Sequence, residues 1–449
     1  MMMMMKRLAR NPWLVFLPFL FYYAYVVVKN KWPTLYGDEL RYVYFAKNML
    51  HGFYSPSPPH INLWNGPGYP IILIPFVALN IPALYMTLMN AVYQYLAVVF
   101  LYKALKLVSN AKIAIVGGLL LALYPNALSM LPILYTEAFT TLLVSAFIYA
   151  ITIYSINEKN KYAIIAGVIL GYLILTKIIF GSVIIISLGA YLIWFLFKRN
   201  RTYLRPLKIL TIAFAICIPY LAYTYYMTGK AMYWGNSGGM SLYWMSTPYE
   251  QEYGDWKLPE LTNKQYPTSF KSVEVVAILK KNHSAEIKAI LKHNELEQDE
   301  LFKQAAINNI KKNPAKFLKN YYYNFSRMLF NFPYSYSYQD AGIVQNILIG
   351  SLTLWASIIG IIITALNWRR IVFSVKFIIL VTVIYLMLSG ALSAYPRQLN
   401  IIIPALIFWL GFLIANIKKA DLKFPQEENL DDIELTDLAG IDGVSVKGL

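Results

Sequence analysis

The sequence predicts an all-α polytopic membrane protein, with about ten or eleven transmembrane helices and two polar loop regions on its outer face. Of its 449 residues 58% are hydrophobic and 14% charged, and the mean hydropathy is +0.47, so the chain carries more apolar surface than a soluble core needs. Several apolar runs approach the roughly 20 residues that a helix needs to cross about 30 Å of hydrocarbon. Such continuous runs are typical of membrane helices and not of barrel strands.

The predicted crossings follow one another from the N-terminus. They lie near residues 13–29, 83–102, 111–130, 132–153, 161–177, 179–197, 206–227, 343–366, 372–395 and 398–416. The basic segment Met1 to Arg10 precedes a run without a small-residue cleavage signature, so we expect the first span to be uncleaved. The segment Tyr69 to Ile81 is short and interrupted by prolines, which favours a re-entrant or interfacial piece.

The positive charge orients these helices. The net charge of +17 comes mainly from short Lys and Arg clusters between apolar runs, which predicts cytoplasmic connections and argues against nucleic-acid binding. The chain then divides into an N-terminal transmembrane module (1–227) with a first outer loop (30–68), an outer loop region (228–342), C-terminal transmembrane helices (343–416) and a cytoplasmic tail (417–449). Chemistry is expected in the two outer regions.

The second outer region has two parts. Gly229 to Pro267 is rich in Gly, Tyr, Trp and Pro and is interpreted as irregular, whereas Ser272 to Phe332 has helical periodicity with amphipathic juxtamembrane helices. Its aromatic residues could stack on sugar rings or form an interfacial belt. Cys217 is the only cysteine and lies in an apolar run, so neither an intramolecular disulfide nor a thiolate metal cluster is expected.

An acidic pair opens the first outer loop. Asp38 and Glu39 begin a short predicted helix just after the first span, where the helix dipole keeps a carboxylate ionised and able to accept a proton. The simpler alternative is that Asp38 caps the helix while Glu39 is solvated.

Several short motifs follow one another along the chain. They are Asp38-Glu39-Leu40-Arg41-Tyr42, Asn65-Gly66-Pro67-Gly68-Tyr69-Pro70, Thr136-Glu137-Ala138-Phe139, Thr176-Lys177, the Ala-rich helix before Asn313-Pro314, and Arg397 before Pro404. The order of these features resembles the C-type glycosyltransferase superfamily, especially bacterial relatives of protein O-mannosyltransferases and the lipid A aminoarabinose transferase. The resemblance implies an all-α polytopic membrane fold of the GT-C type.

The resemblance implies transfer of a sugar from a lipid-linked donor, with Asp38 as general base and Glu39 positioning it or the acceptor. Arg397 is expected to bind the donor phosphate because a guanidinium pairs with two phosphate oxygens, and Lys177 and Arg327 are further candidates. The alternative for each of these cations is a membrane anchor or an interfacial charge. Supporting roles fall to Arg41, Tyr42 and Glu137. A carboxylate at Glu137 needs a partner, which could be a catalytic cation or an internal structural bond.

The predicted function is therefore an inverting hexosyl- or pentosyltransferase in the cytoplasmic membrane, with its active site facing outside. The donor is a polyprenyl-phosphate sugar, and the acceptor could be a glycolipid, a glycan or a protein of the cell envelope. No cofactor is required, although His60 and the loop acids could bind a divalent ion; a solvated histidine is the alternative. We expect a monomer among membrane lipids. Two rival functions are an O-antigen polymerase or ligase and a transporter of lipid-linked sugars.

Overall fold

The computed structural model describes residues 11–259, 272–337 and 343–416, and every regular element among them is a helix. Eight helical stretches in this part of the chain are long and apolar enough to cross a membrane. They are Pro12–Asn30 (α2, Pro12–Val15, with α3, Leu17–Asn30), α6 (Ala83–Val108), α9 (Glu137–Asn157), α11 (Ile179–Lys198), Arg201–Thr228 with α12 (Leu204–Thr228), α17 (Ile343–Leu366), α18 (Phe373–Gly390) and α19 (Pro396–Asn416). The all-α polytopic prediction is confirmed.

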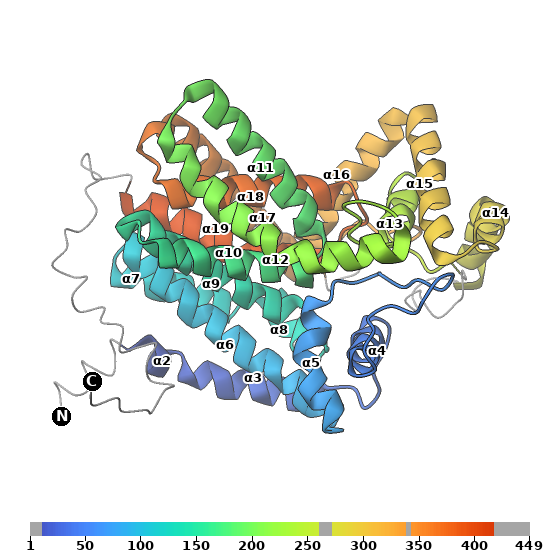
Figure 1. Ribbon diagram of the computed structural model, residues 1–449, viewed down its shortest axis with the longest axis horizontal. Helices are drawn as coiled ribbons and strands as arrows, with labels where there is room; N and C mark the ends of the chain where they lie inside the picture. The colour runs from blue at the N-terminus through green and yellow to red at the C-terminus, as the bar shows by residue number, and fades with distance from the viewer. Residues whose placement is uncertain (1–10, 260–271, 338–342, 417–449) are drawn as a thin grey trace.

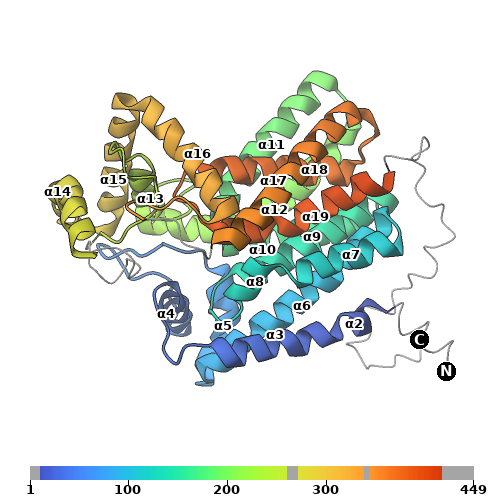
Figure 2. The same cartoon turned by 180° about the vertical axis from the view of Figure 1, so that it is seen from behind.

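Three shorter apolar helices complete the bundle: α5 (Gly68–Ala78), α7 (Ala111–Ala122) and α10 (Asn160–Thr176). Helix α9 lies at the centre, because it packs against α6, α10, α18 and α19. Figure 1 shows the long helices gathered into one body, with α4, α13, α14 and α15 at one end of it. The opposite view in Figure 2 shows α4 on the same side of the bundle as α14. These helices lie at the end where the sequence predicts the outer loops.

One predicted crossing is interrupted, and several others begin or end a few residues from their predicted bounds. The predicted span 111–130 is broken: α7 ends at Ala122, and a short helix, α8, covers Pro125–Met130. Pro125 disfavours helical geometry at the residue before it, and Tyr124 is extended there, which accounts for the break. The predicted span 132–153 becomes helical only at Glu137, where α9 begins.

The described residues of 228–342, the predicted outer region, are more helical than the sequence indicates. Helix α13 (Gly238–Met245) lies within the segment interpreted as irregular, and is followed by α14 (Ser272–Ile290), α15 (Glu295–Lys312) and α16 (Pro314–Phe330). Tyr243 and Trp244 of α13 pack with apolar residues of α14 and α15 in a hydrophobic core of their own. Aromatic residues expected at a sugar-binding or interfacial surface therefore hold this region together. The predicted cytoplasmic tail and the basic N-terminal segment lie outside the described residues.

Candidate active site

The site is built around Asp38, the first residue of α4 (Asp38–Leu50). Gly37 is the residue before the helix, with a φ of +54°, and no side chain caps the helix start. The carboxylate instead meets two guanidinium groups: Oδ1 accepts from Arg41 at 3.0 Å, and Oδ2 accepts from Arg397 at 3.2 Å. The alternative in which Asp38 only caps its helix is therefore wrong.

The two arginines come from opposite ends of the sequence. Arg41 is one turn along α4, also donates to the Asn65 side chain at 3.3 Å, and lies over the Trp64 ring at 4.7 Å. Arg397 lies in the first turn of α19 and faces the Tyr135 ring at 5.5 Å. Burial raises the pKa of Asp38, but Arg397 and Arg41 outweigh burial, so the pKa lies below its ordinary value. The carboxylate is ionised at neutral pH.

Lys177 and Glu137 form a second ion pair in the same neighbourhood. Lys177 follows the last residue of α10, and its ammonium lies 3.0 Å from the carboxylate of Glu137, the first residue of α9. The positive charge of Lys177 also contributes to the lowered pKa of Asp38, which places both pairs in one electrostatic field. The partner that a buried Glu137 needs is thus a lysine from the predicted donor-binding set.

Two glycines of the Asn65-Gly66-Pro67-Gly68 motif allow α5 to pack on the end of α10. A Cβ at Gly66 would lie 2.0 Å from the carbonyl oxygen of Leu175, and one at Gly68 would lie 2.5 Å from Oγ1 of Thr176. The hydroxyl of Tyr172 donates to the Gly68 carbonyl at 2.8 Å. This close approach holds the backbone immediately before Lys177.

Glu39 and Tyr42 support the site from the buried side of α4. Glu39 accepts from the Lys31 ammonium at 2.5 Å, from the Leu134 amide at 2.8 Å and from the Tyr36 amide at 3.1 Å. Glu39 is buried, so the interpretation as a solvated residue is wrong, and its contacts tie α4 to the first span and to the segment before α9. Tyr42 is also buried, and its hydroxyl accepts from Asn65 at 3.4 Å.

Two other predicted site residues, Arg327 and His60, form no ion pair with Asp38 or Glu137 in the described part of the chain. The guanidinium of Arg327 is buried and donates to the carbonyl oxygens of Ala394 at 2.8 Å, Pro333 at 2.6 Å and Tyr253 at 3.2 Å. Arg327 is therefore not an interfacial charge, which was the alternative interpretation. Its guanidinium is also not exposed to a donor phosphate in this structure. His60 is 77% exposed and lies 3.6 Å from Glu295, and no group of three or more His, Cys, Asp or Glu side chains among the described residues could hold a metal ion.

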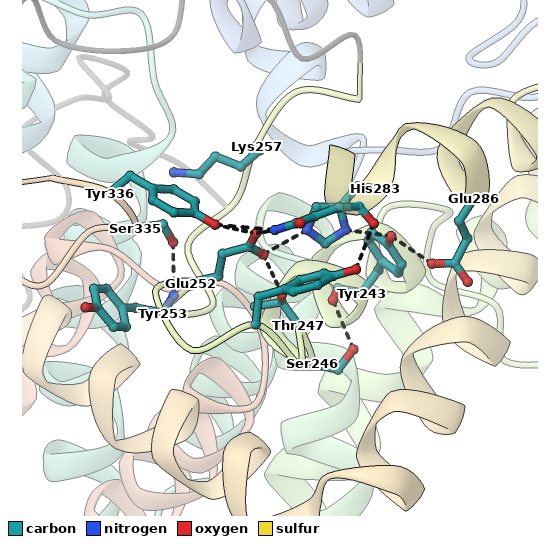
Figure 3. A network of polar contacts seen from close by, with 12 residues as sticks. Tyr243, Ser246, Thr247, Glu252, Tyr253, Lys257, His283, Glu286, Ser335 and Tyr336 are labelled. Carbon is teal, nitrogen blue, oxygen red and sulfur yellow. Dashed lines mark hydrogen bonds and ion pairs between the residues drawn. The ribbon is translucent and has the colours of Figure 1, made fainter. Parts of the chain in front are cut away.

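The structure also contains a buried polar network that the sequence analysis did not identify. Figure 3 shows His283 between Glu252 and Tyr243, with Nε2 at 2.8 Å from the carboxylate and Nδ1 at 2.9 Å from the hydroxyl. Glu252 also accepts from Tyr336 at 3.0 Å, and Tyr243 donates to Glu286 at 2.9 Å. Its members are spread over α13, α14 and two loops, so no local spacing marks them.

Comparison with known proteins gives one family match. Residues 67–223 match the family model described as dolichyl-phosphate-mannose-protein mannosyltransferase. No curated protein sequence matches the chain.

Solved structures of low sequence identity also align with the chain. The archaeal oligosaccharyltransferase AglB of Archaeoglobus fulgidus, in complex with an inhibitory peptide and a dolichol-phosphate, aligns at 13% identity and a TM-score of 0.47 over 96% of this chain and 52% of that protein. A second structure of the Archaeoglobus fulgidus oligosaccharyltransferase, tethered to an acceptor peptide, aligns at 14% identity with a TM-score of 0.43. That alignment covers 88% of this chain and 49% of that protein. ArnT of Cupriavidus metallidurans, bound to undecaprenyl phosphate, aligns at 12% identity with a TM-score of 0.39. The alignment covers 88% of this chain and 77% of that protein.

The chain thus spans about half the length of the archaeal proteins that it matches, 52% and 49%. The family match includes the Asn65-Gly66-Pro67-Gly68 motif from Pro67 onward, Glu137 and Lys177. This match covers residues 67–223 only, and it agrees with the predicted resemblance to relatives of protein O-mannosyltransferases.

Proposed function

We propose that the chain is a glycosyltransferase that moves a sugar from a polyprenyl-phosphate donor to an acceptor at the extracytoplasmic face of the membrane, with Asp38 as general base. The observation that carries this proposal is the pairing of Asp38 with Arg397 at 3.2 Å. The pair brings an ionised carboxylate and a cation that would hold a leaving phosphate into one site, where both can act on the same sugar.

The donor phosphate would be bound by Arg397 and Lys177. Each of these cations is paired with a carboxylate here, Arg397 with Asp38 and Lys177 with Glu137, so an arriving phosphate competes with those carboxylates. When the phosphate draws Arg397 away, Asp38 loses part of the attraction that lowers its pKa and becomes a stronger base. Donor binding would thereby activate the group that accepts the proton. We leave Arg327 out of this set because backbone carbonyls bind it.

The reaction is a single displacement. A hydroxyl or amine of the acceptor attacks the anomeric carbon, Asp38 takes its proton, and the bond between that carbon and the phosphate oxygen breaks. The electron pair of the broken bond leaves with the polyprenyl phosphate, whose growing charge Arg397 and Lys177 stabilise. One carboxylate acting on one face of the sugar gives inversion. The scheme requires no metal ion, and it is compatible with a hexose or pentose and with a lipid, glycan or protein acceptor.

The proposal is tested by incubating the purified chain with a panel of polyprenyl-phosphate sugars and measuring release of polyprenyl phosphate. Asp38→Asn should lower turnover by about 100-fold or more, because the amide cannot accept the proton although the side chain keeps nearly the same shape. Glu250→Gln, which changes an exposed carboxylate, is the matched control. Equal turnover by Asp38→Asn and the wild type would remove Asp38 from the mechanism.

Orientation is tested separately by cysteine labelling. Cys217 is buried, so a single introduced cysteine is the only accessible thiol. A cysteine at Tyr36, an exposed residue just before α4, should react with a membrane-impermeant maleimide in intact cells. A cysteine at Asn200, in the exposed connection between α11 and α12, should react only after the membrane is opened. The reverse pattern would overturn the proposed face of the membrane.

A further inference from the structure

Helix α16 has an unusual distribution of side chains. Asn320, Asn324 and Arg327 lie on one side of the helix, about one turn apart, and each is 0% exposed, whereas the apolar Leu318 and Tyr322 are 67% and 69% exposed. A helix at a membrane surface can expose apolar residues to lipid. Burial of three strongly polar side chains, however, costs free energy unless each has hydrogen-bond partners.

Asn324 donates to Sδ of Met245 at 2.8 Å, and most of its other partners lie at the end of α18 and in the connection to α19. Its amide nitrogen donates to the carbonyl oxygens of Gly390 at 3.0 Å and Leu392 at 2.5 Å. Its amide oxygen accepts from the Ala394 backbone amide at 3.4 Å and from the guanidinium of Arg327. One side chain therefore binds three positions of the segment that ends just before α19.

Arg327 completes the attachment. Its Nε donates to the Ala394 carbonyl at 2.8 Å, so that Ala394 is held at both its amide and its carbonyl group by α16. The same guanidinium reaches the Tyr253 carbonyl at 3.2 Å, and the Tyr395 hydroxyl donates to the Trp256 carbonyl at 3.2 Å. The outer loop and the start of α19 are thus fixed to one another through α16.

We propose that Asn324 and Arg327 are positioning residues, which hold the segment 390–395 so that Arg397 meets the Asp38 carboxylate. Arg397 lies three residues after Ala394, in the first turn of α19, so a shift of that segment moves the guanidinium with it. A misplacement of about 1 Å at a reacting group can cost about 100-fold in rate, so a shift of Arg397 should slow the reaction. This consequence for catalysis rests on the proposed function.

Asn320 provides a matched control on the same helix. It is buried to the same degree and one turn away, but it donates to the carbonyls of Met245 at 3.0 Å and Thr247 at 3.2 Å. It has no hydrogen bond to the segment 390–395. Asn320 also accepts from the Lys316 ammonium at 2.7 Å, as Asn324 accepts from Arg327. Asn324→Ala and Asn320→Ala therefore each remove a buried amide that binds a cation of α16, and only the first releases the connection to α19.

The first experiment is hydrogen exchange of the full-length protein in detergent, followed on peptides that cover residues 390–400. In Asn324→Ala these amides should exchange about tenfold faster than in the wild type, while Asn320→Ala leaves them unchanged. If Asn324→Ala does not fold, Asn324→Ser retains one donor and takes its place. Equal exchange of these peptides in the Asn324 and Asn320 variants would overturn the proposal.

The second experiment measures kcat/KM against pH. The acidic limb reports ionisation of Asp38, whose pKa is lowered by Arg397, Arg41 and Lys177. Loosening Arg397 alone should move this limb to higher pH in Asn324→Ala and leave it in place in Asn320→Ala. An unmoved limb in Asn324→Ala would refute the positioning of Arg397. If Asp38→Asn retains full turnover, Asp38 is not the base, and the exchange result still decides whether α16 holds the segment before Arg397.

Discussion

Arg397 and Lys177 each lie against a carboxylate, and this pairing governs how single substitutions should behave. Glu137 is almost completely buried, and its ion pair with Lys177 has a separation of 3.0 Å. A buried carboxylate that loses its partner keeps the cost of its desolvation and loses the attraction that offset it. Sequence analysis anticipated that Glu137 needs a partner, but two helices had to be placed before Lys177 could be identified.

Lys177→Met should therefore destabilise the fold by about 2–4 kcal/mol, because it leaves the buried Glu137 unpaired. The double variant Lys177→Met with Glu137→Gln should regain most of that loss, since no isolated charge remains. The thermal unfolding midpoint in detergent measures both effects. If the two substitutions lower the midpoint additively, the ion pair does not couple these residues. Both variants should bind polyprenyl phosphate less tightly than the wild type.

Among the helices, the approach of α5 to the end of α10 has the sharpest steric requirement. Gly66→Ala would place a methyl group 2.0 Å from the Leu175 carbonyl oxygen, which is backbone and cannot rotate away. Forcing extra volume into packed contacts typically costs about 1–3 kcal/mol. The displacement also moves Lys177, so turnover should fall along with the unfolding midpoint.

The control for Gly66→Ala is Gly189→Ala in α11, where an added Cβ meets nothing within 4 Å. Alanine favours a helix over glycine by about 1 kcal/mol, so Gly189→Ala should be neutral or stabilising. The two variants are compared by unfolding midpoint and by release of polyprenyl phosphate. If Gly66→Ala gives the same unfolding midpoint and the same turnover as Gly189→Ala, the glycine at position 66 is not needed for the packing of α5 on α10.

The periodicity and length of the apolar runs in the sequence predicted some helices well and missed others, and the reasons can be named. The helix that begins at Asp38 and the ten hydrophobic spans follow from periodicity and apolar length, and the structure has helices at each of these places. Helix α13 was missed because it starts with two glycines and its apolar residues are buried by distant partners in α14 and α15. Arg327 was interpreted from its place beside the membrane, and only the fold reveals that backbone carbonyls surround it.

For the molecule as a whole, the outer region has its own core and its own buried charges. Asp255 is buried and accepts from the Ser335 amide at 3.0 Å and from the ammonium of Lys257. Burial raises the pKa of Asp255, but Lys257 and Arg327 outweigh burial and lower it from 3.8 to about 2. Lys257 and Ser335 appear beside the His283 network in Figure 3, so these contacts hold one part of the outer region.

A carboxylate with a lowered folded-state pKa binds fewer protons in the folded state than in the unfolded state. Its contribution to stability is present above about pH 4 and is lost as the pH falls from about 4 to about 2. The unfolding midpoint of the wild type should therefore drop across this window. Asp255→Asn should start lower at pH 7 and show a shallower acid drop. Parallel acid profiles in the two proteins would show that Asp255 does not contribute to this dependence.

The contact between Asp38 and Arg397 joins positions 359 residues apart in the chain. During synthesis Asp38, the proposed base, emerges from the ribosome long before Arg397. The carboxylate of a partly made chain would therefore lack one of its two guanidinium partners and would have a higher pKa than in the finished fold. A nascent chain released before α19 should therefore be inserted in the membrane but inactive in the polyprenyl-phosphate release assay, because it lacks Arg397.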